Sequence, residues 1–178
     1  MPTWIAFLRA VNVGARKYPM PELRAALEAA GFGDVETHIQ TGNVRFTTPL
    51  RSRSKVESAL EKLIEQDRGF DVTVVALTPR ELAQLAADLE GVAAEHPPGR
   101  GHYVSLLKAT PSRTAAEALE QHGHPDETAV VRGRVVHLLY DKPYHTAKIS
   151  NAAVEKVLGP ATNRNATVIR ALAAKWGG

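Results

Sequence analysis

The stretch HIQTGNVRF, residues 38–46, decides the fold, because it joins two short strand patterns through a turn. In residues 35–41 apolar and threonine side chains alternate with polar ones, which is typical of a strand with one buried face. Gly42-Asn43 fits a two-residue hairpin turn in which glycine takes a positive φ. The predicted register pairs Thr41 with Val44 and Ile39 with Phe46 on the core face, and Gln40 with Arg45 on the other face.

The segments around this hairpin complete a split βαβ pattern. Residues 4–11 are nearly all apolar, which predicts a strand buried on both faces. Pro21 fits the first turn of a helix that Gly31 ends. Ser54-Lys55-Val56-Glu57 matches a capping box for a helix to about Asp67, and residues 70–77 are another apolar strand. Residues 3–77 therefore read β-α-β-β-α-β, the ferredoxin-like order.

The same order recurs in the second half. Thr78-Pro79-Arg80-Glu81 is a second capping box, and residues 91–101 with Pro97-Pro98-Gly99 form a linker. After it come a strand at 102–108, a helix at 110–121, strands at 128–131 and 135–139, a helix at 150–158 and a helix at 167–176. The last helix stands where the final strand of the unit is expected.

We therefore predict an α+β protein of two ferredoxin-like (split β-α-β) subdomains with antiparallel sheets, plus a C-terminal helix. The predicted divisions are residues 1–78 for the first subdomain, 79–101 for a helix and linker, and 102–178 for the second subdomain with the C-terminal helix.

Composition narrows the function classes. The 178 residues include no cysteine, which excludes disulfides and cysteine-ligated zinc. No apolar run approaches the roughly 20 residues of a membrane span, and no signal peptide is visible, so we expect no membrane association and a cytoplasmic location. The net charge is +3 and the basic residues are dispersed, without the clustered basic face of a dedicated nucleic-acid binder.

Common catalytic and cofactor motifs are absent. There is no G-x-G-x-x-G, P-loop, H-E-x-x-H or G-x-S-x-G sequence. The close pair His122-Gly123-His124 is better read as a polar turn than as a metal site, and no metal ligand is assigned. The sequence names no catalytic residue and no cofactor, and it leaves open whether the protein is an enzyme and whether it forms oligomers.

The topology gathers polar residues at one edge of the first sheet. The end of the first strand, the hairpin turn and the start of the first helix all lie there, and a helix N-terminus with adjacent cations suits an anion. Turn formation alone also explains several of these residues, and Arg9 could pair with Asp67. The predicted ligand contacts at this edge are Arg9, Asn12, Lys17, Gln40 and Asn43.

Four blocks resemble the bacterial family called domain of unknown function 1697. They are residues 7–14 (FLRAVNVG), 38–44 (HIQTGNV), 148–151 (KISN) and 162–165 (TNRN), in family order along the chain. The resemblance implies a cytosolic α+β protein of two ferredoxin-like subdomains and implies no activity. The chain departs from the family at Ala10 and Ala15, where Gly is usual, at His38 in place of Tyr, and at Ala166 in place of Trp.

The last two blocks supply a second candidate region. Lys148 precedes a helix start capped by Ser150, and Arg164 and Asn165 precede the last helix, so cations again adjoin helix N-termini. Capping by Ser150 or Asn151, and by Asn165, is the alternative explanation.

Two functions follow from these observations. The first is binding of a small anionic or phosphate-bearing ligand at the sheet edge. The alternative is a nucleic-acid or protein interaction module without catalysis. Base-stacking RNA binding is less favoured, because it needs exposed aromatics on the central strands, and aromatic residues are only 6% of the chain.

Overall fold

A computed structural model describes residues 1–178, and it shows the predicted α+β fold with two four-stranded antiparallel sheets. The chain forms two compact units, residues 1–83 with 172–178 and residues 84–171. The division therefore falls within helices α3 (Pro79–Glu95) and α6 (Ala166–Trp176), which each contain residues of both units. None of the helices combines the length and the apolar composition needed to cross a membrane.

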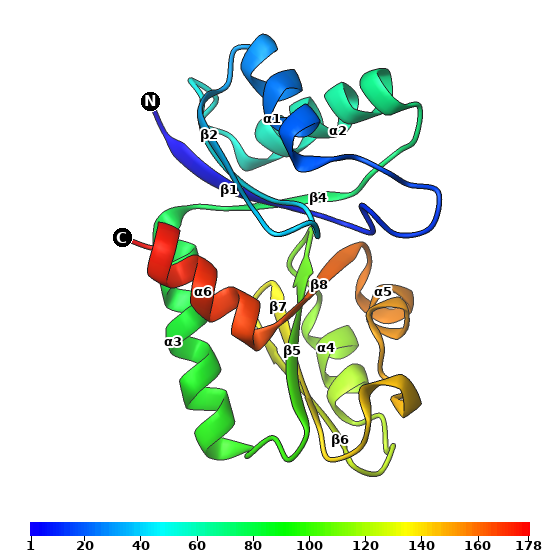
Figure 1. Cartoon of the computed structure of the whole chain (residues 1–178). Helices are drawn as coiled ribbons and strands as arrows, with labels where there is room; N and C mark the ends of the chain where they lie inside the picture. The colour runs from blue at the N-terminus through cyan, green and yellow to red at the C-terminus, as the bar shows by residue number, and fades with distance from the viewer. The chain divides into compact units, whose positions relative to one another are not determined.

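The first unit has the ferredoxin-like strand order β2-β3-β1-β4 (Figure 1). Helices α1 and α2 cover one face of this sheet, where Leu23, Leu27, Leu60 and Ile64 pack in a single core with Phe46. Its elements are β1 (Thr3–Leu8), α1 (Met20–Ala29), β2 (Gly33–His38), β3 (Asn43–Thr47), α2 (Arg53–Arg68), β4 (Val74–Leu77) and the start of α3.

The second unit repeats this order as β6-β7-β5-β8. Leu119 of α4 and Val154 of α5 share a core with Leu107, Val136 and Leu138 of the sheet. Its elements are β5 (Gly101–Leu107), α4 (Arg113–Glu120), β6 (Glu127–Arg132), β7 (Val135–Tyr140), the 3-10 turn η1 (Tyr144–Thr146), α5 (Asn151–Leu158), β8 (Ala161–Asn165) and α6 (Ala166–Trp176).

The predicted hairpin register is wrong, because the turn has four residues, 39–42, rather than two. Asn43 closes this wider turn by donating from Nδ2 to the His38 carbonyl and to Thr41 Oγ1, each at 3.0 Å. Ile39 and Gly42 take positive φ values of 53° and 82°. Ile39 and Gln40 are therefore exposed instead of paired in the sheet. The observed pairs are His38 with Asn43, Thr37 with Val44 and Glu36 with Arg45.

One of the two predicted capping boxes is correct. Thr78 and Glu81 exchange hydrogen bonds, with the Thr78 amide donating to Glu81 Oε2 at 2.8 Å and the Glu81 amide donating to Thr78 Oγ1 at 3.2 Å. The box at Ser54 is wrong, because α2 begins at Arg53. Glu57 is buried and accepts the Ala76 amide of β4 at 2.9 Å. The Glu57 carboxylate therefore binds the backbone of β4 instead of the N-terminus of α2, where the local pattern placed it.

The final strand of the second unit, β8, was not expected. Its sequence, ATNRN, lacks the apolar alternation of a strand, yet it pairs along β5 with Arg164 opposite Val104. Its polar side chains form hydrogen bonds within the unit. Arg164 Nη1 donates to Thr162 Oγ1 at 2.8 Å, and Asn163 Nδ2 donates to Ser105 Oγ at 3.2 Å. The C-terminal helix α6 is thus additional to a complete β-α-β-β-α-β unit.

Two histidines are buried on the second sheet. His102 lies opposite Leu139 and His137 opposite Val130, on the face where Val92 of α3 packs. His102 Nε2 and His137 Nδ1 lie 3.1 Å apart, while His102 Nδ1 and His137 Nε2 have no partner. Either arrangement of the shared proton leaves one N–H and one nitrogen lone pair unsatisfied in the interior.

Burial lowers the pKa of each imidazole from 6.5 to about 4. The surrounding charges act in both directions. Arg170 lowers the pKa of His102 and Glu90 raises it; His102 and Arg132 lower the pKa of His137 and Asp88 raises it. In this pH range the unfolded chain binds more protons than the folded chain, so stability is lost as pH falls from about 6.5 to about 4.

We predict that replacing both histidines by leucine reduces the loss of unfolding free energy between pH 6.5 and pH 4. Each depressed pKa corresponds to at most roughly 3 kcal/mol over this window. Urea denaturation at a series of pH values measures how steeply the free energy of unfolding changes with pH. His145→Leu, at an exposed position of η1, is the control and should retain the wild-type slope. An equal slope in the double variant would contradict the prediction.

Candidate functional site

The chain leaves β1 through a loop in which the sign of φ alternates. Ala10, Asn12 and Gly14 have φ values of 53°, 60° and 57°, whereas Val11 and Val13 are not left-handed. Alternation of right-handed and left-handed residues is the backbone pattern of anion-binding concavities called nests. Here the Asn12 amide donates to the Arg16 carbonyl at 2.7 Å, so the amides that follow it are the ones left for a ligand. The sequence indicated a loop here but gave no sign of left-handed conformation at Ala10.

Asn12 ties this loop to the hairpin turn. Its Nδ2 donates to the Gln40 carbonyl at 2.7 Å and to the Tyr18 carbonyl at 3.0 Å, and its Oδ1 accepts the Tyr18 amide at 2.9 Å. The Leu8 amide also donates to the Gly42 carbonyl at 2.9 Å. The structure therefore brings the end of β1 and residues 39–42 together, as the topology predicted. We call residues 9–18 with residues 39–42 the loop edge.

The loop edge carries an excess of positive charge. No acidic residue precedes Glu22 in the sequence. Arg16 donates from Nε to the Ala10 carbonyl at 3.1 Å and from Nη2 to the Asp71 carbonyl, and its guanidinium lies over the Phe70 ring at 4.7 Å. These partners are uncharged groups, so the charge of Arg16 adds to that of the exposed Lys17.

Two amides at the tip of the loop edge are available to a ligand. The amides of Gly14 and Ala15 are on exposed residues and donate no hydrogen bond within the protein. Lys17 follows them, and its side chain forms no salt bridge. The loop edge thus combines unbonded N–H groups with positive charge, which is the chemistry that holds a phosphate or a carboxylate.

The other predicted ligand contacts at this edge differ in how exposed their side chains are to solvent. The side chain of Gln40 is exposed, whereas Asn43 is fully buried and holds the hairpin turn. Arg9 is half-buried, and its amide donates to the Thr73 carbonyl at 2.9 Å. Asn12 is committed to the loop itself. Lys17 and Gln40 are therefore the side chains that solvent reaches most readily.

The N-terminus of α1 does not provide the anion site that the sequence suggested. The amides of Glu22 and Leu23 both donate to the Pro19 carbonyl at 3.0 Å, and Pro21 has no N–H. Glu22 also places a carboxylate in the first turn and forms a salt bridge with Arg68. Glu22 and Leu23 use their amides locally and Met20 is buried, so the proposed anion chemistry rests on the loop.

Tyr18, the last residue of the first loop, bonds to Asp67, which also pairs with Arg68. The Tyr18 hydroxyl donates to Asp67 Oδ2 at 2.6 Å, and Arg68 Nε donates to the same oxygen at 3.1 Å. Burial and the hydrogen bond to Asp67 raise the pKa of Tyr18 to about 12. Arg68 thus pairs with both Asp67 and Glu22, so these three side chains together keep one net negative charge.

The second predicted region lies in the second unit and consists of separate parts. The Lys148 side chain is exposed, and its amide donates to the buried Glu127 at 2.8 Å. Arg164 is buried in β8, and burial lowers its pKa to about 10. Asn165 caps α6 by accepting the Thr167 amide at 2.9 Å, as the capping alternative stated.

Ser150 likewise caps α5, with its Oγ accepting the Ala153 amide at 3.3 Å. The capping alternative is therefore confirmed at Ser150 as well as at Asn165, while Lys148 remains exposed beside the start of α5.

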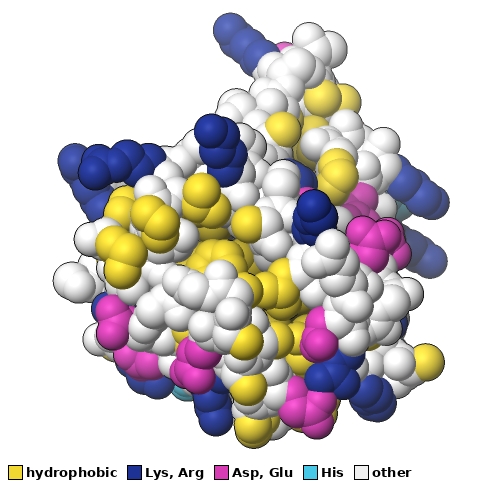
Figure 2. Space-filling model, turned by 90° about the horizontal axis from the view of Figure 1, so that it is seen from above, with side chains coloured by type: hydrophobic (Ala, Val, Ile, Leu, Met, Phe, Trp, Pro, Cys, Tyr) yellow, Lys and Arg dark blue, Asp and Glu magenta, His cyan; other side chains and the backbone are white.

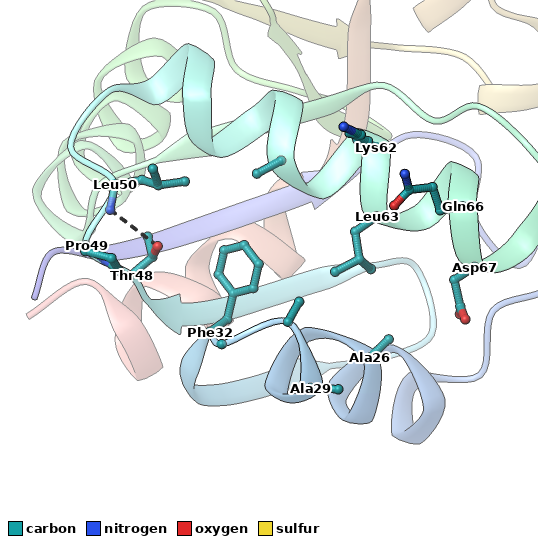
Figure 3. A pocket seen from close by; sticks show the side chains of 13 residues that line it. Ala26, Ala29, Phe32, Thr48, Pro49, Leu50, Lys62, Leu63, Gln66 and Asp67 are labelled. Carbon is teal, nitrogen blue, oxygen red and sulfur yellow. Dashed lines mark hydrogen bonds between the residues drawn. The ribbon is translucent and has the colours of Figure 1, made fainter.

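Sequence reasoning missed a groove between α1 and α2, with a volume of about 800 Å³ (Figure 3). Small side chains at positions 26, 29 and 30 of the first helix were its only sequence signal. We call this the α1–α2 groove; its lining residues are Ala26, Ala29, Ala30, Gly31, Phe32, Thr48, Pro49, Leu50, Ala59, Lys62, Leu63, Gln66 and Asp67.

We predict that Ala10→Gly stabilises the protein by about 0.5–1 kcal/mol. A left-handed alanine costs roughly 1–2 kcal/mol, and glycine removes this cost while making the unfolded chain more flexible. Ala15→Gly is the matched control, because Ala15 is not left-handed and gains only flexibility. Chemical denaturation should show Ala10→Gly more stable and Ala15→Gly less stable than wild type. Destabilisation by both would show that Ala10 is unstrained.

Three comparisons relate the chain to other proteins. It is 18% identical to the conserved bacterial protein SP0830 from Streptococcus pneumoniae, whose solved structure superposes with a TM-score of 0.78 over 100% of this chain and 99% of that one. This likeness shows a shared fold. A search of curated proteins gave no match. Residues 1–137 match the family described as "Protein of unknown function (DUF1697)", so the chain belongs to the DUF1697 family.

Proposed function

We propose that this protein is a cytoplasmic binding protein for a small phosphate- or carboxylate-bearing ligand, held at the loop edge. One observation carries the proposal. The alternating φ signs at residues 10–14 leave the Gly14 and Ala15 amides unbonded beside Lys17. Backbone N–H groups and a nearby cation together supply hydrogen bonds and charge to an anionic oxygen.

Each predicted contact has a role in this proposal. Lys17 provides a mobile charge, and the Gln40 amide can orient a polar part of the ligand. Asn12 and Asn43 hold the two loops in place, so in this proposal they position the ligand-binding groups and do not contact the ligand themselves. Arg9 adds positive charge where β1 ends.

The residues of the second unit form a separate proposed contact region. Lys148 is its exposed cation, while Arg164 and Asn165 support the local structure at the start of α6.

A protein partner is a second candidate for the same edge. Val13 is 61% exposed and Ile39 is 46% exposed, and both lie at the tips of the loop edge. A β-branched residue at φ 53° is strained, and strained exposed residues cluster at functional sites. An apolar contact at these two tips would favour a protein surface over a small ion.

We predict that inorganic phosphate, pyrophosphate or citrate raises the melting temperature of the wild-type protein at constant ionic strength. A ligand at about 100 times its Kd stabilises the folded state by ~2.7 kcal/mol. Lys17→Glu should remove most of this shift, because it reverses the charge beside the free amides.

The matched control is Lys156→Glu, at an exposed lysine of α5, which should keep the wild-type shift. Thermal unfolding of the full chain gives the readout. The proposal fails if none of the three anions stabilises the wild type, or if Lys17→Glu responds as the wild type does. Loss of binding to a protein partner on Val13→Ser and Ile39→Ser, without any anion effect, would support the second candidate.

A further inference from the structure

We propose that the α1–α2 groove binds a long-chain carboxylate, with the alkyl chain between the helices and the carboxylate at Lys62 and Lys55. This site lies between the two helices of the first unit and is separate from the loop edge. The inference therefore stands or falls independently of the proposed anion site.

The groove exists because small side chains face each other across the two helices. Helix α1 directs Leu23 and Leu27 into the core, and it places Ala26 and Ala29 along the groove. Ala59 lies on the α2 side. Methyl groups do not fill the space between two helices, and a volume of about 800 Å³ remains. Small-molecule sites commonly have volumes of about 300–1,000 Å³ and are mostly apolar.

The apolar lining is anchored to the core of the first unit. Phe32, Leu50 and Leu63 are half-buried and pack against that core. The Phe32 ring meets Phe46 edge-on, with centroids 5.1 Å apart, and the Leu50 carbonyl accepts the Trp4 indole N–H at 3.1 Å. Figure 3 shows the side chains of Phe32 and Leu63 directed into the space between the helices. An alkyl chain there would bury apolar surface that water now reaches.

Charge is distributed unevenly along the groove. Lys62 also lines a second cavity of about 410 Å³, which shares Leu50 and Ala59 with the groove and adds Lys55. Lys55 and Lys62 are seven residues apart on α2, which places them two turns apart on one side of the helix. Neither forms a salt bridge, and both are exposed. Asp67, the one acidic residue of the lining, already pairs with Arg68.

An amphiphile with one anionic end matches this arrangement. The carboxylate would lie near the two unpaired lysines, and the chain would run along the alanines of α1. A phosphate or citrate ion has no apolar part to fill the groove. Figure 2 shows hydrophobic side chains gathered in a hollow on this face, with charged side chains around it. A flat membrane surface cannot reach a recessed apolar floor, whereas a single chain can.

Calorimetric titration of the full chain with dodecanoate, below its micelle concentration, tests the proposal. We expect saturable binding of one molecule per chain. Butyrate has the same head without the tail, and it should bind at least about tenfold more weakly because it buries eight fewer methylenes. Dodecyltrimethylammonium has the same tail with a positive head, and it should also bind at least about tenfold more weakly.

Two pairs of variants locate the site. Ala59→Leu fills the groove and should weaken dodecanoate binding by at least about tenfold, whereas Ala118→Leu, on an exposed position of α4, should not. Lys62→Glu should weaken binding about tenfold, whereas Lys156→Glu should not. Circular dichroism checks that each variant is folded, and methyl NMR shifts of Ala26, Ala29 and Ala30 should follow the titration in the wild type.

The proposal is overturned by the absence of saturable dodecanoate binding, by equal binding of the cationic amphiphile, or by unchanged binding in Ala59→Leu. Binding that is lost in Lys17→Glu and kept in Lys62→Glu would assign the carboxylate to the loop edge and also overturn the groove. Dodecanoate binding that persists in Lys17→Glu, with no effect of phosphate, would leave the groove supported and the proposed anion site refuted.

Discussion

Strand β1 lies between β3 and β4, and its side chains from Trp4 to Leu8 are buried. Both neighbours are still hydrogen-bonded where the strand ends, through the Leu8 amide to Gly42 and the Arg9 amide to Thr73. The chain must therefore turn away from the sheet within a few residues. The left-handed residues of the loop edge are the consequence, and they expose the amides that make an anion site chemically feasible.

Each unit contains a buried glutamate whose carboxylate is paired with backbone amides. Glu57 accepts the amide of Ala76, and Glu127 accepts the amides of Lys148 and Ile149 at 2.8 Å. Burial acts to raise the pKa of Glu127, but the hydrogen bonds from Ile149 and from Lys142 outweigh it, so the net pKa is lowered. The histidine pair of the second sheet differs, because two of its four ring nitrogens have no partner.

The first unit offers two chemically different surfaces. The loop edge presents N–H groups and positive charge on exposed residues. The α1–α2 groove presents apolar side chains, with Lys62 in its lining and Lys55 in the adjoining cavity. The first depends on backbone conformation and the second on missing side-chain volume, so a substitution that alters one need not alter the other.

The sequence by itself determined the element order apart from β8, the two antiparallel ferredoxin-like units and the meeting of the first strand with the hairpin. Apolar periodicity, glycine stops and the Thr78 capping box are local signals, and they are strong enough to place these features. The order of elements then limits the topology, because right-handed connections leave few ways to arrange them. The candidate site residues were inferred from that topology, and they stay a prediction.

Only the tertiary structure decided the hairpin register, the strand β8, the role of Glu57 and the existence of the groove. Except at the hairpin, where Asn43 bonds residues nearby in the sequence, a contact distant in the sequence outweighs a local preference. Asn43 closes a four-residue turn, and β8 is a strand because β5 supplies its partners. Glu57 serves the edge of β4 rather than its own helix. The groove depends on which faces of α1 and α2 meet, and spacing along a single helix cannot specify the partner across the gap.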